Sequence, residues 1–289
     1  MLASGCAFYR ASIFTHEIAH MPPGSFRAFR VVWNLFIGIP LMTPTFLYWE
    51  HKSHHVNHSY GTHTDADYFP LGLGPRQLIY VYLAHIILVP AMALSRFILL
   101  TPVSLLHPRL RRFVCQRMSS IATMNPHYRR PLPRGRDRVW WGLQEAGCTF
   151  FGWTLVALTA TGFIRWQGWV CVYGIFFVVA TLNYFRQLGA YRYLNEGEQM
   201  TYREQMLDST TIATNPISGE LWAPLGMRYH ALHHLLPSLP YHAMGTAHRR
   251  LMHRLPEDSP YRLTIRASLW AAVVDVVRNA GGAKSGTGR

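Results

Sequence analysis

The feature that most constrains this chain is a pair of long apolar segments that are separated by only three residues. Residues 146–164 and residues 168–185 contain no charged side chain. Each segment approaches the roughly 20 residues that a helix needs to cross the hydrocarbon core of a bilayer. The two segments therefore predict a transmembrane helical hairpin with a tight turn, and Trp140 and Trp166 lie where an aromatic belt is expected.

The composition agrees with a membrane protein. Hydrophobic residues make up 49% of the 289 residues and charged residues only 15%, whereas about 25% of a typical soluble domain is charged. This balance excludes a disordered chain and argues against an ordinary water-soluble enzyme. The formal net charge is +14, yet no DNA-binding motif accompanies it. We therefore expect a membrane rather than a nucleic acid as the partner of this basic chain.

The arginines indicate how the hairpin is oriented. Residues 107–138 contain nine arginines and a single acidic residue, Asp137, whereas the short turn of the hairpin carries only Arg165. Because basic loops stay on the cytoplasmic side, the loop before the hairpin and the C-terminal third should be cytoplasmic. We expect residues 1–280 to form one membrane domain and the glycine-rich residues 281–289 to form a disordered tail.

Histidines gather in three short motifs, one HxxxH and two HxxHH. They are His16 and His20, then His51, His54 and His55, then His230, His233 and His234. On a helix, residues three or four positions apart share a face, so each motif can present imidazoles to one point. Imidazole nitrogen is a good ligand for iron, zinc, copper and nickel. Eight such ligands are too many for one ion and predict two metals with an open coordination position.

Other polar residues near the motifs are candidates for supporting roles. Carboxylates commonly orient metal-binding imidazoles through their second nitrogen. The candidate carboxylates are Glu17, Asp65 and Asp67, and the candidate additional histidines are His58, His63 and His242.

The three motifs in this order resemble the histidine boxes of the integral-membrane fatty acid desaturases and their hydroxylase and ketolase relatives. The resemblance extends from residue 14 to residue 242 and includes the sequence HHLLPSLPYH at residues 233–242. It implies an all-α membrane fold with a cytoplasmic, histidine-rich cap. It also implies two iron ions bound by the eight histidines, and the use of dioxygen and two electrons to attack an unactivated C–H bond.

The resemblance leaves the reaction open between two outcomes. Desaturation of the acyl chain of a fatty acid or lipid is the expected reaction. Hydroxylation or keto-group formation on a lipid or carotenoid is the alternative, because the boxes do not decide where the substrate lies.

Two departures from the family pattern stand out. Only fifteen residues precede His16, so we expect the first transmembrane hairpin of the family to be missing or truncated. The family often supplies another histidine just after the last span, where this chain has Tyr191. Gln187, one helical turn earlier, is a second candidate to bind metal directly or through water.

The remaining apolar segments are expected to lie at the membrane surface. All three motifs must be on one face of the membrane to share a metal site, so an even number of crossings must separate them. Residues 31–49 contain Pro40 and Pro44, which disfavour a straight span. Residues 78–106 also contain prolines and a charge. We therefore expect residues 31–49 to be interfacial or re-entrant and residues 78–106 to lie along the membrane surface.

Electrons should come from another protein, because the chain contains no dinucleotide, flavin or haem motif. A small acidic carrier such as a ferredoxin or a small cytochrome, with its reductase, is the expected donor. The arginines of residues 107–138 would attract it, or they would bind anionic lipid headgroups.

Two other classes of protein also fit part of the pattern. His16-Glu17-x-x-His20 matches the zinc metalloprotease motif, in which the glutamate activates water. That hypothesis leaves the second and third motifs unexplained. Metal storage or transport is the other alternative, but transport would place histidines inside the spans rather than beside them.

Overall fold

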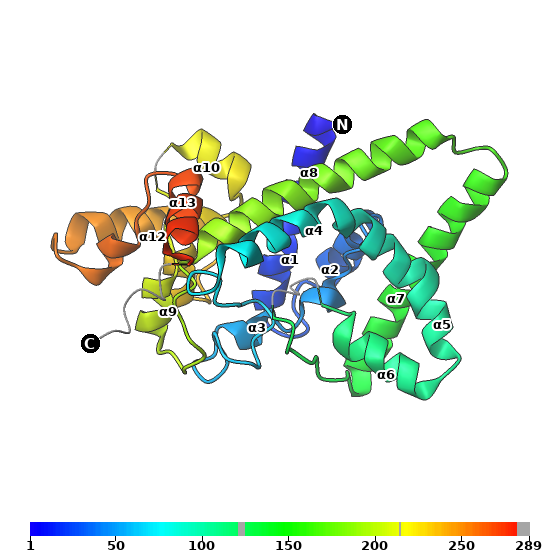
Figure 1. Ribbon diagram of the computed structural model, residues 1–289, viewed down its shortest axis with the longest axis horizontal. Helices are drawn as coiled ribbons and strands as arrows, with labels where there is room; N and C mark the ends of the chain where they lie inside the picture. Colours follow the sequence, from blue (N-terminus) through cyan, green and yellow to red (C-terminus); the bar gives the residue numbers. More distant parts are fainter. Residues whose placement is uncertain (121–124, 214, 282–289) are drawn as a thin grey trace. The chain divides into compact units, whose positions relative to one another are not determined.

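The computed structural model describes residues 1–120, 125–213 and 215–281 (Figure 1). Helices form almost all of its regular structure. The described residues contain no β-strand and only two isolated β-bridges, Tyr191 to Ser209 and Thr211 to Ile265. The predicted all-α class is therefore confirmed for this part of the chain. Most of the expected tail, residues 282–289, lies outside the described residues.

The chain divides into two compact units. Unit 1 comprises Met1–His51 and Ile86–Ala180, and unit 2 comprises Lys52–His85 and Thr181–Arg289. Three helices have residues in both units, namely α3 (His51–His54), α4 (Arg76–Ser95) and α8 (Trp166–Ala190).

Among the described residues, two helices are long and apolar enough to cross a membrane. They are the continuous helix Arg76–Leu105, which comprises α4, a π-helical turn at Arg96–Leu100 and α5 (Thr101–Leu105), and α8. The second arm of the predicted hairpin is thus one of the candidates, but the first arm, residues 146–164, is not. Its helix, α7 (Gly135–Ala160), ends before the apolar segment does, and the turn before that segment contains Gln144 and Glu145. Residues 78–106, expected at the membrane surface, instead supply the other candidate.

Unit 1 contains the helices of the first half of the chain. Besides parts of the shared helices, they are α1 (Leu2–His20), α2 (Arg27–Trp33), the π-helical turn η1 (Asn34–Gly38), the 3₁₀ helix η2 (Thr45–Tyr48), the π-helical turn η3 (Arg96–Leu100), α5, α6 (Pro108–Arg117) and α7. Residues 31–49 form no continuous helix, as the prolines predict. α1 packs against η1 and η2, so the segment that leads into His51 lies beside α1.

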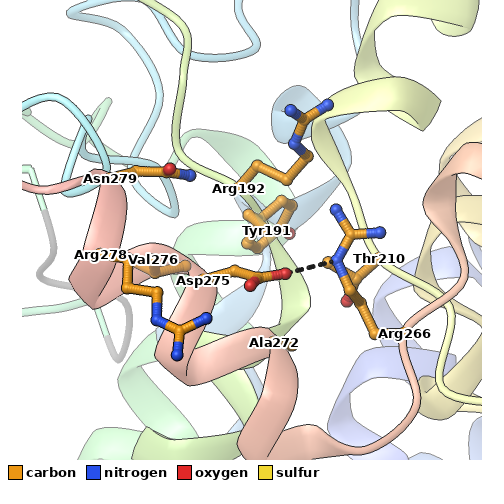
Figure 2. Close-up of a pocket in the computed structure, with 9 residues that line it drawn as sticks. All are labelled: Tyr191, Arg192, Thr210, Arg266, Ala272, Asp275, Val276, Arg278 and Asn279. Carbon is orange, nitrogen blue, oxygen red and sulfur yellow. Dashed lines mark ion pairs between the residues drawn. The ribbon is translucent and has the colours of Figure 1, made fainter. Parts of the chain in front are cut away.

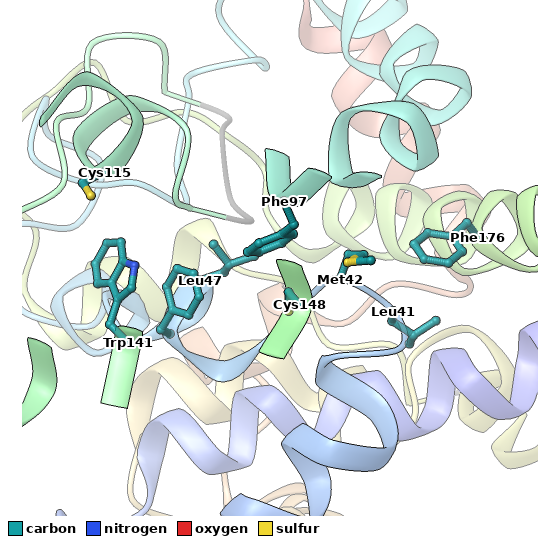
Figure 3. Packing of buried hydrophobic residues seen from close by; sticks show 9 residues of the cluster. Leu41, Met42, Leu47, Phe97, Cys115, Trp141, Cys148 and Phe176 are labelled. Atoms are coloured by element: carbon teal, nitrogen blue, oxygen red, sulfur yellow. The ribbon is translucent and has the colours of Figure 1, made fainter. Parts of the chain in front are cut away.

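Buried hydrophobic side chains form the core of unit 1 (Figure 3), and buried charged side chains lie beside it. The rings of Phe46 and Trp141 stack with centroids 4.6 Å apart. The Arg130 guanidinium lies 4.4 Å from the Trp141 ring and donates to the Phe46 carbonyl. Glu145 on α7 accepts from Arg96 at 2.8 Å and from Arg111 at 2.9 Å. This buried carboxylate therefore connects α7 to the Arg96 turn and to α6.

Unit 2 is built from short helices and paired loops. The helices are α9 (Tyr202–Asp208), α10 (Pro216–Trp222), η4 (Met227–Tyr229), α11 (His230–Leu235), α12 (Tyr241–Arg254), η5 (Pro260–Thr264) and α13 (Leu269–Asn279). A capping box between Thr201 and Glu204 starts α9, and Ser268 caps α13. α11 packs against α9, which fixes the third histidine motif inside this unit.

Candidate metal centre

Three histidines gather in unit 1. His16 and His20 lie one turn apart on α1, with ring centroids 4.8 Å from each other. The His51 ring lies 4.6 Å from that of His16 and 5.2 Å from that of His20. Tyr48 stacks on His51 at 4.6 Å with an interplanar angle of 15°. The i, i+4 spacing and the contact of η2 with α1 thus bring the first motif and the first residue of the second together.

Five histidines gather in unit 2. They are His54, His55, His230, His233 and His234, and each is at most 4% exposed. His55 Nε2 lies 3.1 Å from His233 Nε2, and His230 Nε2 lies 3.2 Å from His234 Nε2. Two distant stretches of sequence therefore place pairs of imidazole nitrogens directly against each other.

These distances suit metal binding. Imidazole nitrogens bind first-row metals at about 2.1 Å, so two adjacent ligands of one ion lie about 3 Å apart. Both Nε2 pairs of unit 2 are within a few tenths of an ångström of that separation. All-imidazole donor sets suit iron, zinc, copper and nickel rather than magnesium or calcium. The residues present in unit 2 therefore fit a transition metal, although donor type alone does not select which one.

Asp65 fixes the orientation of His54. Its Oδ2 accepts from His54 Nδ1 at 2.8 Å and from the Gly61 amide at 2.8 Å. Because a carboxylate only accepts here, Nδ1 carries the proton and Nε2 presents its lone pair. Burial lowers the pKa of His54, but the nearby Asp65 charge and hydrogen bond outweigh burial and raise it. This is the carboxylate–histidine arrangement that orients metal ligands in many proteins.

Tyr191 lies among the histidines. Its hydroxyl donates to His54 Nε2 at 2.8 Å and lies 3.4 Å from His234 Nε2. Backbone pairing holds it there, because Tyr191 forms a bridge with Ser209 and Arg192 N donates to the Asp208 carbonyl at 2.6 Å. Tyr191, which was expected at the position of a family histidine, thus contacts the cluster of unit 2.

The remaining predicted residues fall into two groups. Asp67 is buried, and its backbone amide donates to Asp65 Oδ1 at 2.8 Å. Glu17 Oε1 lies 3.9 Å from His16 Nδ1, beyond hydrogen-bond range. The Gln187 side-chain carbonyl accepts from Arg186 at 3.0 Å. In contrast, His58, His63 and His242 are exposed, so their side chains do not share the burial of the cluster.

The sequence did not indicate Gln205, which supports another histidine. Gln205 Oε1 lies 3.4 Å from His234 Nδ1, while its amide nitrogen donates to the Met200 carbonyl at 3.1 Å. This orientation makes Oε1 the acceptor and leaves His234 Nε2 with its lone pair. The capping box at Thr201 signals the helix start, but not which side chain of α9 faces the histidines.

Asp208 and two tyrosines were also missed. Asp208 Oδ2 accepts from Tyr60 at 3.0 Å and from Tyr68 at 2.7 Å. The Tyr60 ring lies 5.0 Å from that of His54 and 5.3 Å from that of His234. Burial raises the pKa of Asp208, and burial together with the Asp208 charge raises the pKa values of both tyrosines well above normal. The partners are more than a hundred residues apart, so no local motif predicts this network.

Comparison with known proteins gives a consistent result. Residues 1–265 match the family model described as fatty acid desaturase. The chain is 37% identical over 278 residues to a ceramide hydroxylase from Caulobacter vibrioides, an alignment that covers 96% of this chain and 79% of that protein. No solved structure matches the chain.

The family match spans all three histidine motifs, whereas the zinc metalloprotease alternative uses only the first. The family match also agrees with the resemblance that the three motifs and their order indicate. The chain therefore belongs to the fatty acid desaturase family and is a membrane-associated oxidoreductase of that family.

Proposed function

We propose that the eight histidines bind two iron ions and that the enzyme hydroxylates a ceramide-type lipid with dioxygen. The observation that carries the metal assignment is the buried group of five imidazoles in unit 2, with two Nε2 pairs at 3.1 and 3.2 Å. Similarity to a ceramide hydroxylase over 96% of the chain supports hydroxylation and the substrate class.

The protein's own residues prepare the imidazoles. Asp65 and Gln205 accept from the Nδ1 atoms of His54 and His234, so both rings would offer Nε2 lone pairs to a bound metal. Burial of the cluster keeps bulk water away from the ligands. Bound iron supplies the reductive activation of dioxygen that no side chain can provide. The histidines add no negative charge of their own.

The overall reaction balances as a monooxygenation. One C–H bond of the lipid is replaced by C–OH, and the second oxygen atom leaves as water. The reaction consumes one dioxygen, two electrons and two protons. Desaturation uses the same inputs but removes two hydrogens from adjacent carbons and releases two waters. Because the chain matches the fatty acid desaturase family model, desaturation is the second candidate function. Analysis of the product distinguishes it from hydroxylation.

We propose that a small acidic ferredoxin or cytochrome, with its reductase, delivers the electrons on the cytoplasmic side. Of the nine arginines in residues 107–138, three make internal contacts. Arg111 pairs with Glu145, Arg117 donates to the Pro126 carbonyl, and Arg130 is buried. Arg109, Arg112, Arg129, Arg134, Arg136 and Arg138 are exposed. Such a surface attracts an acidic carrier, and the attraction weakens with ionic strength.

The test is lipid analysis of cells that make ceramide and express the full chain with a ferredoxin and its reductase. Three chains are compared: the unmodified chain, His233→Ala and His253→Ala. His253 is an exposed histidine of α12 and provides the matched control. Mass spectrometry follows each ceramide species and its fragments.

The expected result is ceramide that has gained one oxygen atom, present with the unmodified chain and His253→Ala and absent with His233→Ala. Ceramide that has lost two hydrogens would replace hydroxylation with desaturation. Equal product from His233→Ala would contradict the metal assignment.

A further inference from the structure

A polar cavity of about 230 Å³ lies in unit 2, next to the segment that carries Tyr191 (Figure 2). Its lining includes Arg192, Arg266 and Arg278, together with Asp275. Three guanidinium groups against one carboxylate leave two positive charges in excess around the cavity. Such a lining favours an anion.

The carboxylate is already engaged. Asp275 Oδ2 lies 2.9 Å from Arg266 Nε, and the Arg266 side chain also donates to the Leu263 and Ile265 carbonyls at 2.9 and 3.0 Å. In Figure 2 the dashed line joins Asp275 to Arg266 only, so no carboxylate among the nine residues drawn pairs with Arg192 or Arg278. The excess charge therefore resides on those two arginines.

The Arg192 guanidinium makes few hydrogen bonds to the residues that the structure describes. Its Nη1 donates to the Leu207 carbonyl at a long 3.4 Å. Its Nε is buried and has no hydrogen-bond partner among the residues that the structure describes. A buried donor without an acceptor is costly, and a guanidinium fork matches the oxygens of a phosphate. An oxyanion in the cavity would supply the missing acceptor.

The cavity is built on paired backbone rather than on a loose loop. Thr210 N donates to the Ala190 carbonyl at 2.9 Å, and Arg266 N donates to the Thr211 carbonyl at 2.8 Å. The segments that carry Arg192, Thr210 and Arg266 are thus hydrogen-bonded side by side. Arg278 and Asp275 come from α13, which Ser268 caps through the Ala271 amide at 3.0 Å. The lining is therefore preorganised for a ligand.

The volume limits the ligand. Pockets for whole small molecules are about 300–1,000 Å³, and this cavity, at about 230 Å³, is smaller. It suits a headgroup-sized anion rather than a lipid chain. We propose that this cavity is a binding site for a phosphate-type oxyanion, either the headgroup of a lipid or free phosphate. The cavity adjoins the proposed metal centre through Tyr191, which lines it and contacts His54, but the test of anion binding needs no turnover.

Binding can be measured on the full chain in micelles of an uncharged maltoside detergent. Calorimetric titrations use two probes, inorganic phosphate and the short-chain lipid dihexanoyl phosphatidate. If the cavity binds a lipid headgroup, the phosphatidate should bind at least about tenfold more tightly than inorganic phosphate, which corresponds to about 1.4 kcal/mol. If it binds free phosphate, both probes should bind with similar affinity.

Three variants test the lining, and a fourth is the control. Arg192→Gln and Arg278→Gln each remove a charged donor and should weaken the tighter probe about tenfold. Asp275→Asn removes the competing carboxylate and should strengthen binding about threefold or more. Arg250→Gln removes an equal charge from an exposed position of α12 and should stay within about twofold of the unmodified chain.

Weaker binding by the two arginine variants together with stronger binding by Asp275→Asn would support the site. Because Arg278 is exposed, its substitution tests the charge even where Arg192→Gln disturbs folding. Absence of saturable binding by both probes would overturn the proposal. So would equal binding by Arg278→Gln and the unmodified chain.

Discussion

Buried carboxylates take different partners in the two units. In unit 2, Asp65 bonds directly to His54, and Asp208 accepts from tyrosines whose rings contact the histidines. In unit 1, the buried carboxylate of Glu145 pairs with Arg96 and Arg111, while Tyr48 stacks on His51. Unit 2 therefore uses buried charge to orient its imidazoles, whereas unit 1 uses it to join helices. Substitutions of these residues and their partners test that division.

Glu145→Gln should have the largest effect, and the effect should be on stability. It leaves the buried Arg96 without its ionic partner, a change that costs about 3–5 kcal/mol in buried ion pairs. Denaturant unfolding in micelles, followed by tryptophan fluorescence, measures the loss. Glu196→Gln is the matched control at an exposed position and should change little. An equal effect of the two variants would remove the structural role assigned to Glu145.

The same carboxylate predicts a pH dependence. Burial raises the pKa of Glu145, but hydrogen bonds and charges of Arg111 and Arg96 outweigh burial and hold it below 4.5. A depressed folded-state pKa contributes stability that is fully present above the unfolded value and is lost as pH falls through the folded value. The difference in unfolding free energy between the unmodified chain and Glu145→Gln should therefore shrink below pH 4.5. A difference that stays constant on acidification would contradict this.

Asp65→Asn should impair metal retention in the cluster of unit 2. Loss of a carboxylate that orients a ligand typically costs about 10–100-fold in metal affinity or activity. Competition with an iron chelator measures the change. Glu17→Gln makes the matched substitution beside His16, where the carboxylate lies 3.9 Å away. It should change affinity by less than about threefold, because this carboxylate lies too far from His16 Nδ1 to orient that ring by a hydrogen bond. Equal losses would erase the distinction between the units.

The two tyrosines on Asp208 should differ from each other. Tyr68→Phe removes a donor to Asp208 and also the acceptor of the Asn195 amide at 2.9 Å. Tyr60→Phe removes only the donor to Asp208. We expect a loss of about 1 kcal/mol in unfolding free energy for Tyr60→Phe and about 1–3 kcal/mol for Tyr68→Phe. Thermal unfolding of both variants checks the order, and a reversed order would refute it.

The smallest effect should come from Tyr48 in unit 1. Its ring stacks on His51, and stacking of this kind is worth about 0.5–1.5 kcal/mol. Tyr48→Leu should lose most of this contribution to unfolding free energy, whereas Tyr48→Phe keeps the ring and should lose less. If Tyr48→Phe were the more damaging variant, stacking would not be what holds His51.

Contacts between residues close in sequence could be predicted from the sequence, whereas contacts between distant segments could not. The spacing within each motif predicted which histidines share a face, since helix periodicity is local. Asp65 was found because it lies close in sequence to the second motif. Gln205, Asp208 and Tyr60 were missed because packing between distant segments brings them to the histidines. Residues 146–164 were expected as one arm of a hairpin, but α7 ends at Ala160, and hydropathy alone does not determine where a helix ends.

The claim that all three motifs bind metal is tested most directly by the metal content of the purified full chain. The chain is loaded anaerobically with ferrous iron, desalted and analysed beside His16→Ala and His233→Ala, which remove one imidazole from each unit. We predict two irons per unmodified chain and a loss of iron in both variants. One zinc per chain, or full iron content in either variant, would contradict the account.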